Sequence, residues 1–148
     1  MTTIACNRRC MAADRLVVCA EGMLYARKIK RVKTPYGTSL LGGCGSISAI
    51  HAFFTWMERQ DRSNLPVISN AGLDFQFSAL ELRQDGSIWA YEELFQSYPV
   101  DYKYAAIGSG GQSALALMSI GWSPQDAVKQ TRKIDAGTGG RVDVEWVK

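Results

Sequence analysis

The sequence has 148 residues, 47% of them hydrophobic and 21% charged, which is typical of a globular chain and predicts one domain spanning residues 1–148. Its net charge of +3 is too small to require a nucleic-acid or membrane partner. No apolar run approaches the roughly 20 residues that cross a membrane, and the beginning lacks the basic and apolar regions of a secretion signal, so we expect a cytoplasmic protein.

Short strands dominate the first third of the sequence. Runs of alternating apolar and polar residues, separated by turn-forming residues, predict these strands. They span residues 2–7, 11–13, 15–20, 23–26, 28–34 and 38–43. Glu21-Gly22 and Pro35-Tyr36-Gly37 suit the turns that would join the last four strands into two hairpins.

A helix follows these strands, and two more lie near the end of the chain. Over residues 46–60, Ile47, Ile50, Phe53 and Met57 recur at the spacing of an amphipathic helix. The remaining elements, in chain order, are a loop over 61–73, strands over 74–83, 87–91 and 102–107, helices over 112–121 and 123–135, and a strand over 142–147. This order predicts the α+β class, with helices covering antiparallel sheets.

The sequence offers four cysteines and one histidine as metal ligands or nucleophiles: Cys6, Cys10, Cys19, Cys44 and His51. The cysteine spacing does not match the paired spacing of a structural zinc site, so we expect no bound metal and interpret the cysteines as small buried thiols in a reducing compartment. A Cys–His nucleophilic pair remains an alternative, although nothing around His51 would orient it. Because His51 lies in the apolar predicted helix, we interpret it as a packed or interface side chain.

A basic run at residues 27–33 raises the question of nucleic-acid binding. On a strand, Lys28 and Lys30 share one face while Arg27 and Arg31 share the other, so the charges form no continuous stripe. No aromatic residues alternate with them to stack on bases. The run therefore predicts no nucleic-acid partner.

The residue after the initiator methionine carries a chemical signal. Removal of Met1 would leave Thr2 at the N-terminus, with a hydroxyl nucleophile and a free α-amine on the same residue. An α-amine has an ordinary pKa of about 7.7–8.0, so a useful fraction is neutral near neutral pH and can act as the base. Nucleophile and base would then come from one residue, which is how enzymes with an N-terminal threonine activate their hydroxyl group.

Five blocks of sequence resemble a known family in their order and spacing, and a sixth resembles its last helix-to-strand junction. They are Thr2-Thr3-Ile4-Ala5, Ala12-Ala13-Asp14, Lys28-Ile29-Lys30-Arg31-Val32, Leu41-Gly42-Gly43-Cys44-Gly45, Ile107-Gly108-Ser109-Gly110-Gly111 and Asp135-Ala136-Gly137-Thr138-Gly139-Gly140. The chain is similar to proteasome β-type subunits, and especially to the simpler bacterial HslV-type peptidases. This resemblance implies the N-terminal-nucleophile (Ntn) hydrolase fold, a four-layer αββα sandwich of two antiparallel sheets.

The resemblance also implies catalytic roles, residue by residue. Thr2 Oγ would be the nucleophile, Lys28 would lower the pKa of the Thr2 amine and hydroxyl, and Asp14 would hold Lys28 in place. The N–H of Gly42 would form the oxyanion hole. Three further residues would surround the N-terminal amine, namely Ser109, Asp135 and Thr138. Each of these residues also fits a structural role, such as a strand lysine, a turn aspartate, a strand end or a helix cap.

Two departures from the family pattern affect the expected packing. Asp14 is followed directly by Arg15, where family members have an intervening residue, so the segment that leads to Lys28 is short. Residues 61–73 replace the second long helix of the family fold, which would leave one helical layer thinner and the subunit more dependent on its neighbours.

These features predict a threonine-type endopeptidase that hydrolyses polypeptides once Met1 is removed, without a cofactor or metal. A further hypothesis places Lys30 in the specificity pocket with Leu40 and Cys44, where it would admit acidic or polar side chains. The resemblance implies a homo-oligomeric ring that an ATP-dependent unfoldase could feed, and the lack of a leader before Met1 fits the HslV type. Two alternatives stay open: a non-catalytic ring or shell subunit with the same fold, and a small-molecule Ntn amidase.

Overall fold

The computed structural model describes residues 2–59, 76–93 and 95–148. Its strands are β1 (Ile4–Asn7), β2 (Cys10–Asp14), β3 (Leu16–Cys19), β4 (Gly22–Tyr25), β5 (Ile29–Thr34), β6 (Gly37–Gly45), β7 (Phe77–Leu82), β8 (Ile88–Tyr91), β9 (Ser97–Pro99), β10 (Tyr104–Ile107) and β11 (Val142–Trp146). Its helices are α1 (Ile47–Arg59), α2 (Gly111–Ser119) and α3 (Pro124–Thr131).

The predicted α+β class and order of elements are confirmed. The strand β9 was not predicted, because its three residues, Ser97, Tyr98 and Pro99, are all exposed and show no alternation. The last helix ends at Thr131, four residues before the predicted end at Asp135. The predicted loop at residues 61–73 lies outside the described residues.

The strands form two larger sheets and one separate hairpin, and every pairing between them is antiparallel. One sheet has the order β10-β1-β2-β11 and the other has the order β5-β6-β7-β8-β9, while β3 pairs only with β4. In the first sheet, Ile4 pairs with both Ile107 and Ala13, and Val142 pairs with Asp14. The residues before β1, after β2, after β10 and before β11 therefore meet at one end of this sheet.

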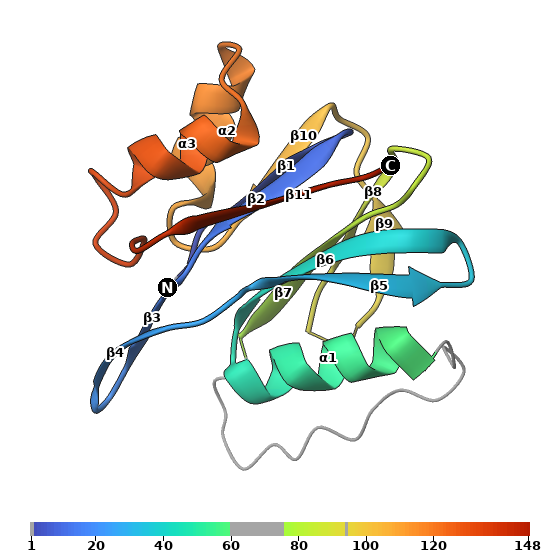
Figure 1. Ribbon diagram of the computed structural model, residues 1–148, viewed down its shortest axis with the longest axis horizontal. Coiled ribbons are helices and arrows are strands. Elements are labelled where there is room, and N and C mark those ends of the chain that lie inside the picture. Colours follow the sequence, from blue (N-terminus) through green and yellow to red (C-terminus); the bar gives the residue numbers. More distant parts are fainter. Residues whose placement is uncertain (1, 60–75, 94) are drawn as a thin grey trace.

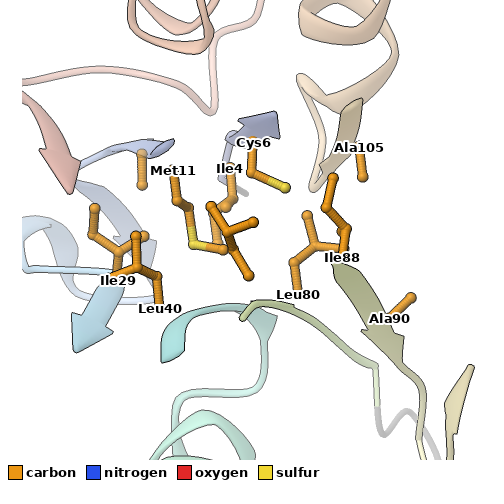
Figure 2. Packing of buried hydrophobic residues seen from close by; sticks show 11 residues of the cluster. Ile4, Cys6, Met11, Ile29, Leu40, Leu80, Ile88, Ala90 and Ala105 are labelled. Carbon is orange, nitrogen blue, oxygen red and sulfur yellow. The ribbon is translucent and has the colours of Figure 1, made fainter. Parts of the chain in front are cut away.

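The two larger sheets pack face to face through a buried apolar cluster (Figure 2). Ile4, Cys6 and Met11 come from the first sheet, and Leu40 and Leu80 from the second. Because the side chains of a strand alternate between its two faces, each sheet also has an outer apolar face that needs a cover.

Helices supply the cover on both outer faces (Figure 1). Helix α1 lies against the outer face of the β5–β9 sheet, where Phe53 and Met57 are fully buried. Helices α2 and α3 cover the first sheet through Ala114, Met118 and Val128. No helix in the described parts of the chain has the length and apolar character needed to cross a lipid bilayer.

Helix α3 has a clear start signal in the sequence. The Ser123 side chain accepts a hydrogen bond from the Asp126 N–H at 3.1 Å, and Pro124 occupies the first turn, where its missing N–H costs nothing. The helix ends next to the first sheet, and the Asp135 N–H donates to the Thr131 carbonyl just beyond it at 2.9 Å. This end of α3 carries the residues that approach the N-terminus.

The β3–β4 hairpin projects from the molecule and exposes an apolar surface (Figure 1). The exposed fractions are 40% for Val18, 69% for Met23, 59% for Leu24 and 65% for Tyr25. An isolated two-stranded hairpin is only marginally stable in water, so this one needs further contacts to hold its shape.

Candidate active site

Thr2 lies at the end of the first sheet where the four segments meet, and it is only 6% exposed. Its backbone N–H donates to Ser109 Oγ at 3.2 Å, and its carbonyl accepts from the Gly110 N–H at 3.4 Å. Gly108 has a φ of +94°, and a Cβ at this position would lie 2.0 Å from the Thr2 carbonyl oxygen. Only glycine allows the turn after β10 to come this close to Thr2.

Asp14 and Lys28 form a buried ion pair beside Thr2. Lys28 Nζ donates to Asp14 Oδ1 at 2.8 Å and to the Leu16 carbonyl at 2.5 Å. Lys28 is 6% exposed and Asp14 is fully buried. The structure therefore brings together the lysine and aspartate that the sequence paired, and burial of both partners fixes the direction of the lysine.

The environment of Lys28 changes its acidity. Burial lowers the pKa of the Lys28 ammonium because it removes solvation from the charged form, while the hydrogen bond and charge of Asp14 raise it; the net direction is downward. The Lys28 ammonium is thus a stronger acid than the ammonium of a lysine in water, and its neutral amine is a weaker base.

Ser109, Asp135 and Thr138 form a hydrogen-bonded chain that begins at the Thr2 nitrogen. Ser109 Oγ donates to Asp135 Oδ2 at 2.7 Å, and Thr138 Oγ1 donates to the same carboxylate oxygen. Since Thr138 uses its proton on Asp135, the Thr3 hydroxyl is the donor in its 2.5 Å contact with Thr138. Burial raises the pKa of Asp135, but the hydrogen bonds from Thr138 and Ser109 lower it, and the net direction is downward. The Ser109 hydroxyl therefore links the Thr2 nitrogen to a carboxylate anion.

Gly42, the glycine predicted for the oxyanion hole, and its neighbour Gly43 point their N–H groups in opposite directions. The Ser46 N–H just after β6 donates to the Gln76 carbonyl at 2.9 Å. Because N–H groups alternate in direction along a strand, the N–H groups of the even-numbered residues of β6 point to β7, and that of Gly42 points to Leu80. The Gly43 N–H instead faces the Lys28 carbonyl across a 3.3 Å contact. The structure therefore does not bring the predicted Gly42 to the cavities at Thr2, whereas the neighbouring Gly43 lines one of them.

Side-chain direction agrees with this placement. A Cβ on Gly42 would lie 2.9 Å from Ile4 in the inter-sheet core, whereas a Cβ on Gly43 would point to Ile50 of α1. Gly43 lines a cavity with Thr2 and Lys28, and Gly42 is not among the described residues that line it.

Two cavities meet at Thr2. The first, here called the apolar cavity, has a volume of about 160 Å³ and lies between α1 and the β3–β4 hairpin. Its walls include Val17, Val18, Ile50 and Phe54, with His51, Arg27 and Lys28 among the other lining residues. The second, here called the polar cavity, has a volume of about 400 Å³ and is lined by residues that include Thr2, Cys44, Ser78, Glu93 and Ser109.

Only one residue of the hypothesised specificity pocket lies at a cavity. Cys44 lines the polar cavity, where its thiol lies 3.0 Å from Ser78 Oγ. Leu40 is fully buried between the sheets, so it does not line either cavity. Lys30 pairs with Glu58 of α1 at 2.6 Å and is absent from the described lining of both. The placement of Lys30 and Leu40 in this pocket was therefore wrong.

The cysteines and His51 also depart in part from expectation. Cys6, Cys10 and Cys44 are buried as predicted, but Cys19 is exposed in the β3–β4 hairpin. His51 is exposed and lines the apolar cavity, so it is not packed within the subunit. The described residues contain no cluster of three or more His, Cys, Asp or Glu side chains arranged to hold a metal ion.

The sequence did not single out two residues that help to build this arrangement. The Thr3 N–H donates to Asp14 Oδ1 at 2.9 Å, and the Gly139 N–H donates to Asp14 Oδ2 at the same distance. Both residues lie inside the sequence blocks that carry the family resemblance, which was the available signal. Their role could not be predicted from residue type, because the donors are backbone N–H groups that every residue except proline has.

No protein-family model matches the sequence, and no curated protein matches it in sequence. Solved structures, in contrast, are similar over nearly the whole chain. BPH from Thiobacillus denitrificans has 18% identity and a TM-score of 0.70, covering 99% of this chain and 98% of that one. HslV from Trypanosoma brucei has 19% identity and a TM-score of 0.68, with coverage of 97% and 98%.

Anbu, the ancestral β-subunit from Yersinia bercovieri, has 13% identity and a TM-score of 0.73, covering 98% of this chain and 81% of its own. The chain has the proteasome-type Ntn-hydrolase fold. At these identities the similarity establishes the fold alone. In this proteasome-type fold, Thr2, Lys28, Asp14 and Gly43 come together at one end of the first sheet.

Proposed function

We propose that this chain is a threonine-type endopeptidase whose nucleophile is Thr2 Oγ, exposed together with its α-amine by removal of Met1. The observation that carries the proposal is the position of Thr2. It lies between two cavities, with its nitrogen 3.2 Å from Ser109 Oγ and the buried Lys28–Asp14 pair lining or flanking the same site.

The geometry supports a sequence of proton transfers that needs no metal. The Thr2 amine takes the hydroxyl proton as Oγ attacks the peptide carbonyl, and the nearby Lys28 cation favours the deprotonated hydroxyl. The Gly43 N–H, whose hydrogen bond to the Lys28 carbonyl is long at 3.3 Å, is shared with the carbonyl oxygen of the substrate as negative charge develops there. The protonated amine then delivers its proton to the leaving nitrogen, and water hydrolyses the resulting ester with Thr2.

The Ser109–Asp135–Thr138 chain supports the amine in this mechanism. Ser109 Oγ accepts a hydrogen bond from the Thr2 nitrogen while it donates to Asp135, so it orients the amine. The carboxylate favours the protonated amine after it has taken up the hydroxyl proton. One similar structure, BPH from Thiobacillus denitrificans, was solved in complex with epoxomicin and has 17% identity and a TM-score of 0.68.

The test is covalent labelling of mature protein. N-terminal mass spectrometry first establishes that Met1 is absent, and an epoxyketone peptide is then added. We expect one adduct on Thr2, hydrolysis of fluorogenic peptides, and loss of both in Thr2→Ala. Retained Met1 in native material, or a processed protein without labelling or peptide hydrolysis, would contradict the proposal and favour a ring or shell subunit. Turnover of short amides alone would favour a small-molecule amidase.

We further propose that the protein forms a homo-oligomer with a four-layer αββα subunit. The exposed apolar side chains of the β3–β4 hairpin support self-association, because contact with another subunit would remove this apolar surface from water. One similar structure is a helical assembly of the Anbu complex from Pseudomonas aeruginosa, with 9% identity and a TM-score of 0.71. A ring geometry, an unfoldase partner and a cytoplasmic location complete the proposal.

A further inference from the structure

The two cavities that meet at Thr2 differ in charge. Among the described residues, the ionisable groups that line the apolar cavity are Arg27, Lys28 and His51, with no carboxylate. Of the described residues that line the polar cavity, the ionisable ones are Cys44 and Glu93, and none is Lys, Arg or His. A substrate that spans Thr2 therefore passes from a cationic surface to an anionic one.

The polar cavity continues away from Thr2 into a larger one. A cavity of about 700 Å³, here called the distal cavity, shares Phe77, Ser78 and Glu93 with the polar cavity and extends to Glu92 and Tyr98. Because the two cavities share these lining residues, they adjoin and together extend from Thr2 past the start of β7 to β9; they are here called the groove. A site that continues from Thr2 into a second cavity has room for more than one residue of an extended chain.

Glu93 is the charged residue common to both parts of the groove. Its side chain is exposed, and no side chain of the described parts of the protein pairs with its carboxylate. The neighbouring Glu92 differs, because its Oε1 accepts a hydrogen bond from the Tyr98 hydroxyl at 3.2 Å and it lines only the distal cavity. The other polar lining groups include Gln76 and Ser78, which are neutral.

We propose that Glu93 is a specificity-determining residue, and that the groove takes a lysine or arginine side chain of an extended polypeptide substrate. The proposal rests on the peptidase function proposed above. Lysine and arginine suit the groove because their apolar stems can lie against Phe77 while the charged end reaches the carboxylate. An acidic side chain in the same place would meet two glutamates, which disfavours it.

The test compares quenched fluorogenic peptides that differ at one position by lysine or norleucine, which have similar stems. Each position on both sides of the cleaved bond is varied in turn, using mature protein, Glu93→Gln and Glu93→Lys. We expect one position at which lysine is preferred, a fall in this preference of about 2- to 5-fold in Glu93→Gln, and its reversal in Glu93→Lys. The kcat/KM for the norleucine peptide should change by less than that for the lysine peptide.

Asp101→Asn is the matched control, because it removes the same charge from an exposed residue that lines none of these cavities. The lysine preference should also fall at high salt in the unmodified protein and not in Glu93→Gln. Peptide cleavage without a lysine preference, or a preference equal in Glu93→Gln and Asp101→Asn, would overturn the proposal while leaving the peptidase intact. Absence of both cleavage and Thr2 labelling would overturn the proposed function, and this proposal with it.

Discussion

Asp14 accepts hydrogen bonds from four residues, of which Leu16 is close in the sequence and Thr3, Lys28 and Gly139 are more distant. Its Oδ1 accepts from the Thr3 N–H and Lys28 Nζ, and its Oδ2 accepts from the Leu16 and Gly139 N–H groups. A carboxylate can satisfy all four donors because each oxygen offers two acceptor sites. This one side chain therefore connects the segment before β1, the β3–β4 hairpin, the residue before β5 and the loop before β11.

Replacement of Asp14 by asparagine should be strongly destabilising. The amide cannot accept on both sides as a carboxylate does, and Lys28 would become a buried charge without its partner, at a cost of about 3–5 kcal/mol in the free energy of unfolding. Urea denaturation gives this difference. Asp143→Asn is the control, because its pair with Arg15 is partly exposed; equal losses in the two variants would contradict the special role of Asp14.

The buried Cys6 thiol makes the free energy of unfolding depend on pH in the alkaline range. Burial raises the pKa of the Cys6 thiol from 9.0 to about 12. Between these values the unfolded chain loses the proton while the folded protein keeps it, so stability falls by about 1.4 kcal/mol per pH unit above the unfolded pKa. Cys10, whose pKa is raised to about 11, adds to this slope. In Cys6→Ala we expect a shallower loss of stability between about pH 9 and 11, measured by denaturation; parallel slopes would disprove it.

At the scale of elements, the two neighbouring glycines of β6 lie on opposite faces of its sheet: a side chain at Gly42 would point into the core between the sheets, and one at Gly43 would point to α1. Gly42→Ala would press a methyl group into Ile4 and Met11, so we expect a loss of about 1–3 kcal/mol in the free energy of unfolding. Gly43→Ala would place the methyl group 3.1 Å from Ile50 on the side of the apolar cavity. Compared with Gly42→Ala, this variant should label more slowly at Thr2 and lose less free energy of unfolding. Labelling rates and urea denaturation of both variants test this, and the reverse pattern would restore Gly42 as the oxyanion donor.

The sequence predicted the order of the elements well because their periodicity is local. It also paired Lys28 with Asp14 and grouped Ser109, Asp135 and Thr138, through short blocks with distinctive residues. It pointed to Gly42, whereas the neighbouring Gly43 lines a cavity with Thr2, because the run Gly42-Gly43-Cys44-Gly45 looks alike in either register and only pairing with β5 and β7 decides the direction of each residue. Leu40 and Lys30 were misplaced because a strand pattern does not say which sheet face meets the core.

At the scale of the whole molecule, the β3–β4 hairpin is the part least supported by the subunit itself. Leu24 is 59% exposed, and Leu24→Glu should weaken any contact that buries the hairpin while leaving the folded subunit intact. We expect a shift from oligomer to monomer in light scattering coupled to gel filtration. Glu21→Gln, at the turn of the same hairpin, is the control, and an unchanged assembly in Leu24→Glu would exclude the hairpin as an interface.

The carboxylate of Asp14 also sets an order of events in time. The Gly139 N–H donates the last hydrogen bond to this carboxylate, and Asp135 and Thr138 complete the network at the Thr2 nitrogen, yet all three residues are synthesised long after Thr2. A chain still being synthesised therefore carries Thr2 and Lys28 before the groups that orient them. We expect the site to be fully assembled only after the segment between α3 and β11 has been made and has packed against the first sheet.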